Sequence, residues 1–181
     1  MTGRRVQLVL LCEDRQQEAF LRRFFQAAGL GRRVLRVERC STGGQGAAEQ
    51  WVRSRYAPEV RGLRSAASVA RALVVAIDAD TAGVQERERQ LTAALKDEGL
   101  RARKPGERIL HIIPERNIET WLRYLQGNDV DTATAYPRLP RERDCAPLVT
   151  DLKAMCDSGA LRKPAPPSLE RACKEYRARL K

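Results

Sequence analysis

The sequence has one histidine, few aromatic residues and no long apolar run. His111 is the single histidine among 181 residues, and aromatic residues make up 5% of the chain. One histidine cannot supply the grouped histidine ligands of histidine-metal nucleases and phosphatases, so we do not expect chemistry of that kind. A membrane helix needs about 18 apolar residues in succession, and no run approaches this length. We therefore expect no membrane-spanning segment and no membrane partner.

Cysteine is present but lacks the spacing of a structural framework. The five cysteines are an odd number, and no two of them form a Cys-x-x-Cys pair. Disulfide-rich domains and structural zinc sites normally show paired patterns, so we expect neither. No secretion signal is visible, because the apolar run after Arg4 and Arg5 ends at Glu13. These observations predict a reduced, cytoplasmic protein in which Cys12 belongs to the core.

Positive charge dominates the composition. The chain has 34 Lys and Arg against 23 Asp and Glu, a net charge of +11, and 43% of its residues are hydrophobic, enough for a core. Most of the cations are arginines, whose planar group can bind a phosphate through two hydrogen bonds. A basic surface of this size favours a polyanion, and nucleic acid is the first candidate partner. The other interpretation, arginine used as a general surface cation by a GC-rich genome, stays open.

Short apolar runs alternate along the chain with segments of helical periodicity. The runs predict strands at residues 6–12, 34–38, 72–78 and 108–114. Strands that alternate with helices form a mostly parallel sheet with helices on both faces. The sequence therefore predicts an α/β fold of about four strands, with one domain over residues 1–127. Residues 40–46 are rich in glycine and are expected to form a flexible connection.

Turn and capping residues mark the expected helices. Helical periodicity is found over residues 13–29, 47–63, 81–99, 117–127, 146–157 and 168–180. Pro58 lacks the amide proton that a helix interior needs, so the second helix is expected to break there. Thr81 is a candidate cap for the third helix. From residue 128 to 181 prolines become frequent, which predicts a small helical extension after the main domain.

Acidic residues follow three of the predicted strands. Glu13 and Asp14 follow the first strand, Asp78 and Asp80 follow the central one, and Glu115 follows the last, with Glu119 on the next helix. The carboxyl ends of parallel strands meet at one edge of a sheet, where functional groups collect. Carboxylates brought together repel each other, and a hard divalent cation with oxygen ligands offsets that repulsion. We therefore predict a site for Mg²⁺ or Mn²⁺ at this edge.

Each of these acids also has a purely structural interpretation. Acids such as Asp14 favour the positive end of a helix, and Asp80 could cap the helix that begins beside it. Glu18, one turn further along the first helix, is either a ligand of a second metal or part of a solvated face. Glu119 taken alone could be a surface acid. Arg116 follows the last strand and is a candidate for binding phosphate charge.

Three short motifs together resemble the Toprim domain. They are CED after the first strand, IDAD after the central strand, and NIETWL on the helix after the last strand. The third motif is similar to Toprim-like nucleases of the overcoming-lysogenization-defect group and their small relatives linked to phage defence. The resemblance covers roughly residues 5–126 and implies that Glu13, Asp78, Asp80 and Glu119 bind metal.

The sequence departs from part of that family at Asp14. Toprim domains of topoisomerases and primases usually carry a glycine at this place, as does a small maturase of ribosomal RNA. No tyrosine stands where a DNA-cleaving nucleophile would be expected. The resemblance therefore favours a nuclease over a strand-passing enzyme or a maturase.

These observations lead to a functional hypothesis with one rival. We expect a metal-dependent endonuclease that hydrolyses phosphodiester bonds of DNA or RNA, with a water activated by the metal attacking phosphorus. The resemblance implies phage defence or restriction of foreign nucleic acid, with a separate ATPase subunit as a candidate partner. Homo-oligomers are left open. The rival is a catalytically weak Toprim-like subunit that binds nucleic acid or a partner protein within a defence complex.

Overall fold

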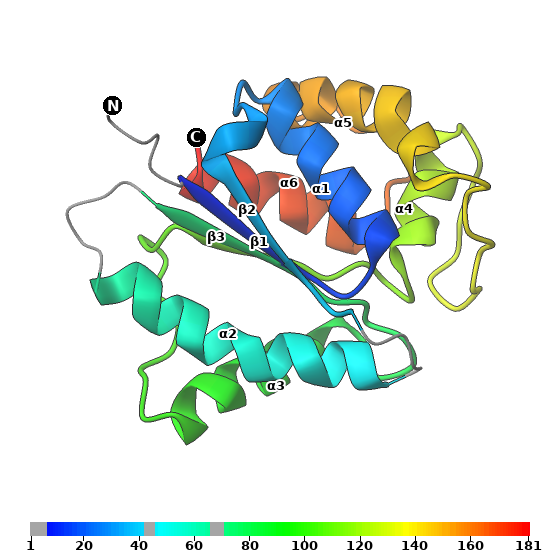
Figure 1. Cartoon of the computed structure of the whole chain (residues 1–181). Helices are drawn as coiled ribbons and strands as arrows, with labels where there is room; N and C mark the ends of the chain where they lie inside the picture. Colours follow the sequence, from blue (N-terminus) through cyan, green and yellow to red (C-terminus); the bar gives the residue numbers. More distant parts are fainter. Residues whose placement is uncertain (1–6, 42–45, 66–70) are drawn as a thin grey trace.

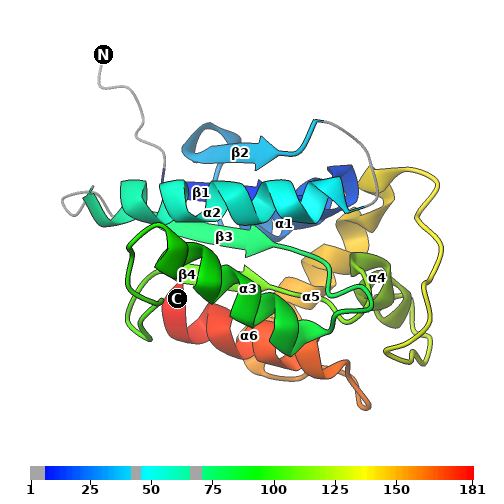
Figure 2. The same cartoon turned by 90° about the horizontal axis from the view of Figure 1, so that it is seen from below.

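The computed structural model describes residues 7–41, 46–65 and 71–181. Within them, four parallel strands form one sheet in the order β2-β1-β3-β4 (Figures 1 and 2). The strands are β1 (Leu8–Cys12), β2 (Leu35–Arg39), β3 (Ala72–Ala76) and β4 (Ile109–Ile112). The predicted fold class is confirmed. Residue 6 of the first predicted strand and residues 42–45 of the glycine-rich segment lie outside the described residues.

Strands β1, β3 and β4 are buried along their whole length, whereas β2 is half-buried at the edge of the sheet. Alternate residues of β1 enter different cores, because side chains of a strand point to opposite faces. Leu8 and Leu10 belong to one hydrophobic cluster, while Val9 and Leu11 belong to the other. Continuous apolar runs therefore form a sheet that is covered on both sides.

Helices cover both faces of the sheet (Figures 1 and 2). Helices α2 (Ala47–Ser65) and α3 (Val84–Asp97) lie on one face. The other face carries α1 (Arg15–Ala27), α4 (Ile118–Leu125), α5 (Ala146–Ser158) and α6 (Pro167–Arg179). Two short 3₁₀ helices, η1 (Arg32–Val34) and η2 (Glu142–Cys145), complete the described secondary structure. In the described part of the chain, no helix combines the length and the apolar character needed to cross a membrane.

Two expectations about helix ends are wrong. Helix α2 continues through Pro58, which is exposed, so the carbonyl that loses its amide partner can be hydrated. The buried side chains Val52, Tyr56 and Val60 hold both halves of this helix against the sheet. Helix α3 is preceded by Gly83 as N-cap, with φ of 89°, rather than by Thr81.

The C-terminal helices pack on the same core as α1 and α4. Val149 of α5 and Leu169 of α6 are fully buried in the cluster that also contains Phe20 and Trp121. Helix α6 lies along β4, the edge strand of the sheet. The boundary at residue 127 stays a prediction, but the helical extension after it is present and shares this core.

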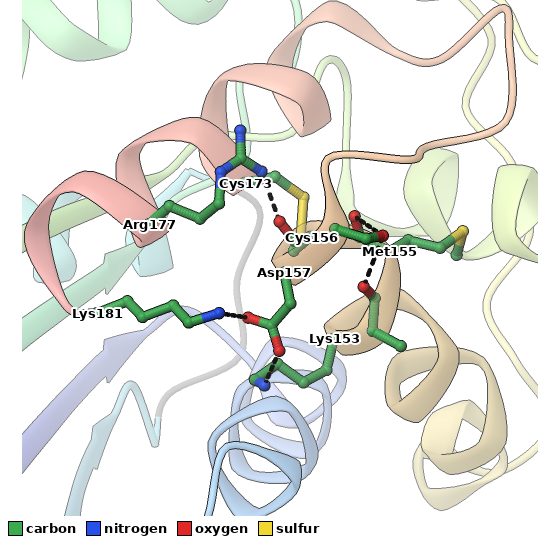
Figure 3. The surroundings of a disulfide bond; sticks show 9 residues. Lys153, Met155, Cys156, Asp157, Cys173, Arg177 and Lys181 are labelled. Carbon is green, nitrogen blue, oxygen red and sulfur yellow. Dashed lines mark hydrogen bonds and ion pairs between the residues drawn. A yellow bond between two sulfur atoms is a disulfide. The ribbon is translucent and has the colours of Figure 1, made fainter.

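A disulfide joins α5 to α6, contrary to the expectation of a fully reduced chain. Cys156 and Cys173 are both buried, and their Cα atoms lie 4.9 Å apart, within the range that a disulfide spans (Figure 3). Packing of two helices brings the residues together, so no sequence spacing announces the pair. Cys12 is buried in the core, as predicted.

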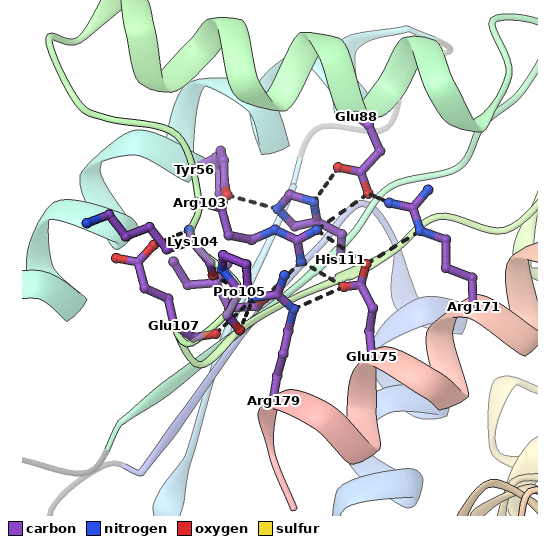
Figure 4. Close-up of polar contacts among 11 residues, drawn as sticks. Tyr56, Glu88, Arg103, Lys104, Pro105, Glu107, His111, Arg171, Glu175 and Arg179 are labelled. Carbon is purple, nitrogen blue, oxygen red and sulfur yellow. Dashed lines mark hydrogen bonds and ion pairs between the residues drawn. The ribbon is translucent and has the colours of Figure 1, made fainter.

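A polar network fastens β4 to the helices around it (Figure 4). His111 is a residue of β4, as predicted, and its ring lies between Tyr56 and Glu88. Its Nε2 is 2.8 Å from the tyrosine oxygen, and its Nδ1 is 2.8 Å from Oε2 of the glutamate. Arg103 extends the network to Glu175 of α6 at 2.8 Å. Because Tyr56 and His111 are buried, this group ties α2, α3, β4 and α6 together.

Candidate functional site

A cleft of about 700 Å³ opens at the carboxyl edge of the sheet. Its lining includes Glu13 after β1, Asp78 and Asp80 after β3, and Glu119 on α4. The parallel topology brings these side chains to one place because all four strands end at this edge. Four of the acids predicted as metal ligands, which come from three segments of the chain, therefore line one cleft.

Glu13 and Asp78 are joined through a buried glutamine. The backbone N–H of Asp78 donates to Oε1 of Glu13 at 3.3 Å. Nε2 of Gln17 donates to Oδ1 of Asp78 at 3.0 Å, and its Oε1 accepts from the backbone N–H of Glu13 at 2.8 Å. Gln17 is fully buried on α1. No sequence motif indicates this residue, and its only local sign is its place one turn after the capping residue Asp14.

Three of the cleft carboxyls have raised pKa values. Burial, followed by the charge of Asp80, raises the pKa of Glu13 to about 8. Burial also raises the pKa of Asp78 well above its ordinary value, and Glu13 and Glu119 add to the effect. The pKa of Glu119 is raised, mainly by burial and then by Asp14. Each acid is costly to ionise here because burial removes water from its charge, and neighbouring acids add repulsion.

Asp80 lies at the open rim of the cleft and is held by two arginines. Its backbone adopts a positive φ of 48°, and its N–H donates to the carbonyl of Arg116 at 2.7 Å. Nη2 of Arg87 lies 3.4 Å from Oδ2 of Asp80. Asp80 is not the N-cap of α3, so its alternative role as a cap is not adopted.

Arg87 is a second residue that the sequence analysis missed. It is buried on α3, and its Nε donates to the backbone carbonyl of Asp78 at 2.9 Å. Its Nη1 pairs with Glu49 at 3.0 Å. Arg87 thus binds the carboxylate of Asp80 but only the backbone of Asp78, which leaves the Asp78 carboxylate without an arginine partner among the described residues.

Glu119 projects from the first turn of α4 into the cleft. It is 4% exposed, and within the described part of the chain its buried Oε1 has no hydrogen-bond partner. The nearest cation is Arg138, whose Nε lies 3.8 Å from that oxygen. Nη2 of Arg138 also donates to Oδ2 of Asp14 at 3.0 Å. Arg138 follows α4 in an exposed segment without a recognisable motif, so the sequence analysis did not single it out.

The other predicted site residues lie elsewhere or act differently. Glu18 accepts hydrogen bonds from Arg22 and Arg39, each at 2.8 Å, and these bonds lower its pKa although partial burial would raise it. It does not line the cleft. Arg116, with φ of 62°, contributes its backbone carbonyl to Asp80. The side chain of Glu115 accepts from Ser168 at the beginning of α6, which explains why this acid stays out of the cleft.

The residues present fit a hard divalent cation. Carboxylate oxygens are its preferred ligands, and the buried Oε1 of Glu119, in the cleft that the other acids line, has no hydrogen-bond partner among the described residues. Among the described residues, no three histidine, cysteine, aspartate or glutamate side chains form a group that is already close enough to hold a metal ion. The cleft therefore supplies the ligand chemistry, while bringing the side chains around an ion would require them to shift.

The fold and the cleft together define a class: an α/β protein with an acidic cleft at the carboxyl edge of a parallel sheet. Comparison of the chain with protein-family models, with curated proteins and with solved structures finds no match.

Proposed function

We propose that the protein is a Mg²⁺- or Mn²⁺-dependent nuclease that hydrolyses phosphodiester bonds of DNA or RNA. The observation that carries the proposal is that the buried Asp78 and Glu119 and the half-buried Glu13 share one cleft, with raised pKa values, in a chain of net charge +11. Concentrated buried acid in a basic protein is costly unless a cation joins it. An acidic metal site beside basic surface suits the cleavage of a polyanion.

Each residue of the cleft has a distinct part in this proposal. Asp78, Glu13 and Glu119 would hold the ion from inside the cleft, and Asp80 would complete its ligands from the rim. A bound divalent ion supplies stabilisation of phosphate charge and lowers the pKa of water. Gln17 fixes the carboxylate of Asp78 relative to the backbone of Glu13. Phosphate binding by the side chain of Arg116 stays part of the proposal.

The biological setting in the proposal comes from the sequence motifs. The acids of CED, IDAD and NIETWL line one cleft, which is the arrangement expected if the chain is a Toprim-like nuclease. That resemblance supports a role in phage defence or restriction of foreign nucleic acid, inside the cell and with a separate ATPase subunit as partner.

A cleavage assay tests the activity. The protein is incubated with plasmid DNA, single-stranded DNA, tRNA and rRNA in the presence of Mg²⁺ or Mn²⁺. The Asp78→Asn variant should lose activity, while Asp97→Asn, an exposed acid at the far end of α3, should keep it. Cleavage that survives Asp78→Asn would contradict the mechanism.

One observation favours the rival function, a catalytically weak binding subunit. Arginines of the chain itself already contact several cleft acids: Arg87 binds Asp80, and Arg138 binds Asp14 close to Glu119. Such internal cations can replace a metal. Specific binding of nucleic acid that is indifferent to Mn²⁺ and to Asp78→Asn, with no cleavage of any of the four substrates, would support the rival.

A further inference from the structure

Beside the acidic cleft lies a second recess with the opposite charge. It has a volume of about 600 Å³ and is lined by five arginines and two glutamates. Its walls come from three segments, namely the first turns of α1, the end of β2 and the η2 segment. The arginines are Arg15, Arg22, Arg39, Arg141 and Arg143.

Part of this arginine set is held in place by acids. Glu18 accepts from both Arg22 and Arg39, and Asp144 pairs with Arg141 at 3.0 Å. These pairs orient guanidinium groups on the wall of the recess without neutralising the whole set. The sequence predicts Glu18 as a metal ligand. In the structure this side chain instead holds the guanidinium groups of Arg22 and Arg39 in position.

Two arginines of the recess remain available to a ligand. Arg15 and Arg143 are exposed, and neither has an ion-pair partner in the described ranges 7–41, 46–65 and 71–181. The segment that carries Arg143 is anchored to α1, because Nε2 of the buried Gln16 donates to the carbonyl of Glu142 at 3.2 Å. Both free cations thus project from fixed backbone into one recess.

The recess is continuous with the acidic cleft. Three residues line both the acidic cleft and the recess, namely Arg15, Arg39 and Glu142. They form the wall between the two. A phosphodiester strand approaching the acids alone would be repelled by their charge. Arginines at the mouth of the cleft offset this repulsion and bind backbone phosphates through two hydrogen bonds each.

We propose that this recess binds the phosphodiester backbone of a nucleic acid next to the acidic cleft, with Arg15 and Arg143 as its main phosphate ligands. This inference rests on the proposed function. It adds that the nucleic-acid strand reaches the acidic cleft along the arginine recess. A recess of this volume with several guanidinium groups on three walls matches successive phosphates of one strand better than a single small anion.

Binding measured without metal tests this inference independently of cleavage. Fluorescence anisotropy would follow labelled DNA and RNA oligonucleotides of equal sequence in EDTA, at several NaCl concentrations. The Arg15→Glu/Arg143→Glu variant should bind the preferred strand ~10-fold or more weakly, and its salt dependence should fall by about 1 to 2 in logarithmic slope.

A matched control separates the recess from general charge. Arg32→Glu/Arg33→Glu changes the net charge equally, in exposed residues at the amino end of β2, on the opposite edge of the sheet from the cleft. This control should keep most of its affinity. Arg15→Gln/Arg143→Gln removes the charges without reversing them, so it should lose affinity for the oligonucleotide as well, but less. Melting curves would verify that all variants fold.

Several outcomes would overturn the inference. They are equal losses in recess and control variants, absence of binding by the unmodified protein, and full competition by millimolar inorganic phosphate, which would indicate a single-anion site. Nuclease activity that depends on Asp78 but is indifferent to the recess variants would refute the recess and leave the proposed function standing. Recess-dependent binding without any cleavage would refute the nuclease and leave the recess standing.

Discussion

The side-chain amide of Gln17 on α1 donates to the carboxylate of Asp78 after β3, 61 residues away, at 3.0 Å. The same side chain accepts from the backbone N–H of Glu13, so one buried residue links two strand ends. This link fixes the carboxylate of Asp78 relative to the backbone of Glu13. Several measurable consequences arise from it and from the charges around it.

Gln17→Leu should destabilise the protein and weaken metal binding. The change leaves the amide of Glu13 and a carboxylate oxygen of Asp78 without their partner, and each lost buried bond costs about 1–3 kcal/mol. Urea unfolding measures the free energy of unfolding, and calorimetric titration with Mn²⁺ measures the affinity. Gln26→Leu, on the same helix but only partly buried, is the control and should change neither quantity appreciably. An unchanged unfolding midpoint for Gln17→Leu would show that the link is unimportant.

Without metal, the contribution of Glu13 should make the protein less stable as pH rises. The pKa of Glu13 is raised to about 8 in the folded state, so between its ordinary value of about 4.3 and 8 the folded state binds more protons than the unfolded state. The resulting stabilisation is complete at low pH and is lost as pH rises through about 8. Glu13→Gln should therefore gain stability relative to the unmodified protein as pH increases, by up to a few kcal/mol.

Unfolding midpoints of both proteins between pH 5 and 9 test this behaviour, because titrating groups that do not interact with Glu13 cancel in the difference; Asp78, whose pKa Glu13 raises, adds to the difference. Saturating Mn²⁺ should remove the advantage of Glu13→Gln, since the ion offsets the repulsion. A difference that is flat with pH would contradict the raised pKa.

Arg138→Ala should tighten Mn²⁺ binding. The arginine donates to Asp14 and lies 3.8 Å from Glu119, so it competes with a metal for Glu119. Because the side chain is exposed, the expected gain is small, up to about 5-fold in affinity. Arg33→Ala, on the opposite edge of the sheet, serves as the control in the same titration. Weaker binding in Arg138→Ala would instead show that the arginine helps to shape the site.

The His111 network should make the protein sensitive to mild acid. Burial lowers the pKa of His111, although Glu88 acts in the opposite direction. The unfolded state therefore binds a proton at His111 near pH 6.5, whereas the folded state binds it only at lower pH. The contribution of the neutral His111 to stability is lost as pH falls below about 6.5. His111→Gln should be less stable at pH 7.5 but should lose less further stability down to pH 5.5. Equal pH dependence of the two proteins in urea unfolding would contradict this assignment.

The alternation of apolar and helical segments was sufficient to predict the sheet. Burial on both faces requires runs such as Leu8–Cys12 and Ala72–Ala76, and these runs are visible without any tertiary knowledge. Pro58 was misread because the cost of a missing amide was considered without the packing that holds α2. The cap of α3 was misread because Gly83 acts through its backbone conformation, which has no side-chain signature.

The sequence by itself determined which acids stand at strand ends, and the parallel sheet that it predicts places them at one edge; the pairing of β1 with β3 then sets Glu13 beside Asp78. Tertiary structure alone decided the partners of those acids. Gln17 and Arg87 contact Asp78 because of the rotation of their helices about their axes, and Arg138 meets Asp14 across 124 residues of chain. The same rotation directs Glu18 away to Arg22 and Arg39. The positions of the strands follow from local patterns. The strand order β2-β1-β3-β4 and the direction of each side chain depend on how whole elements pack, and that packing is a property of the entire core.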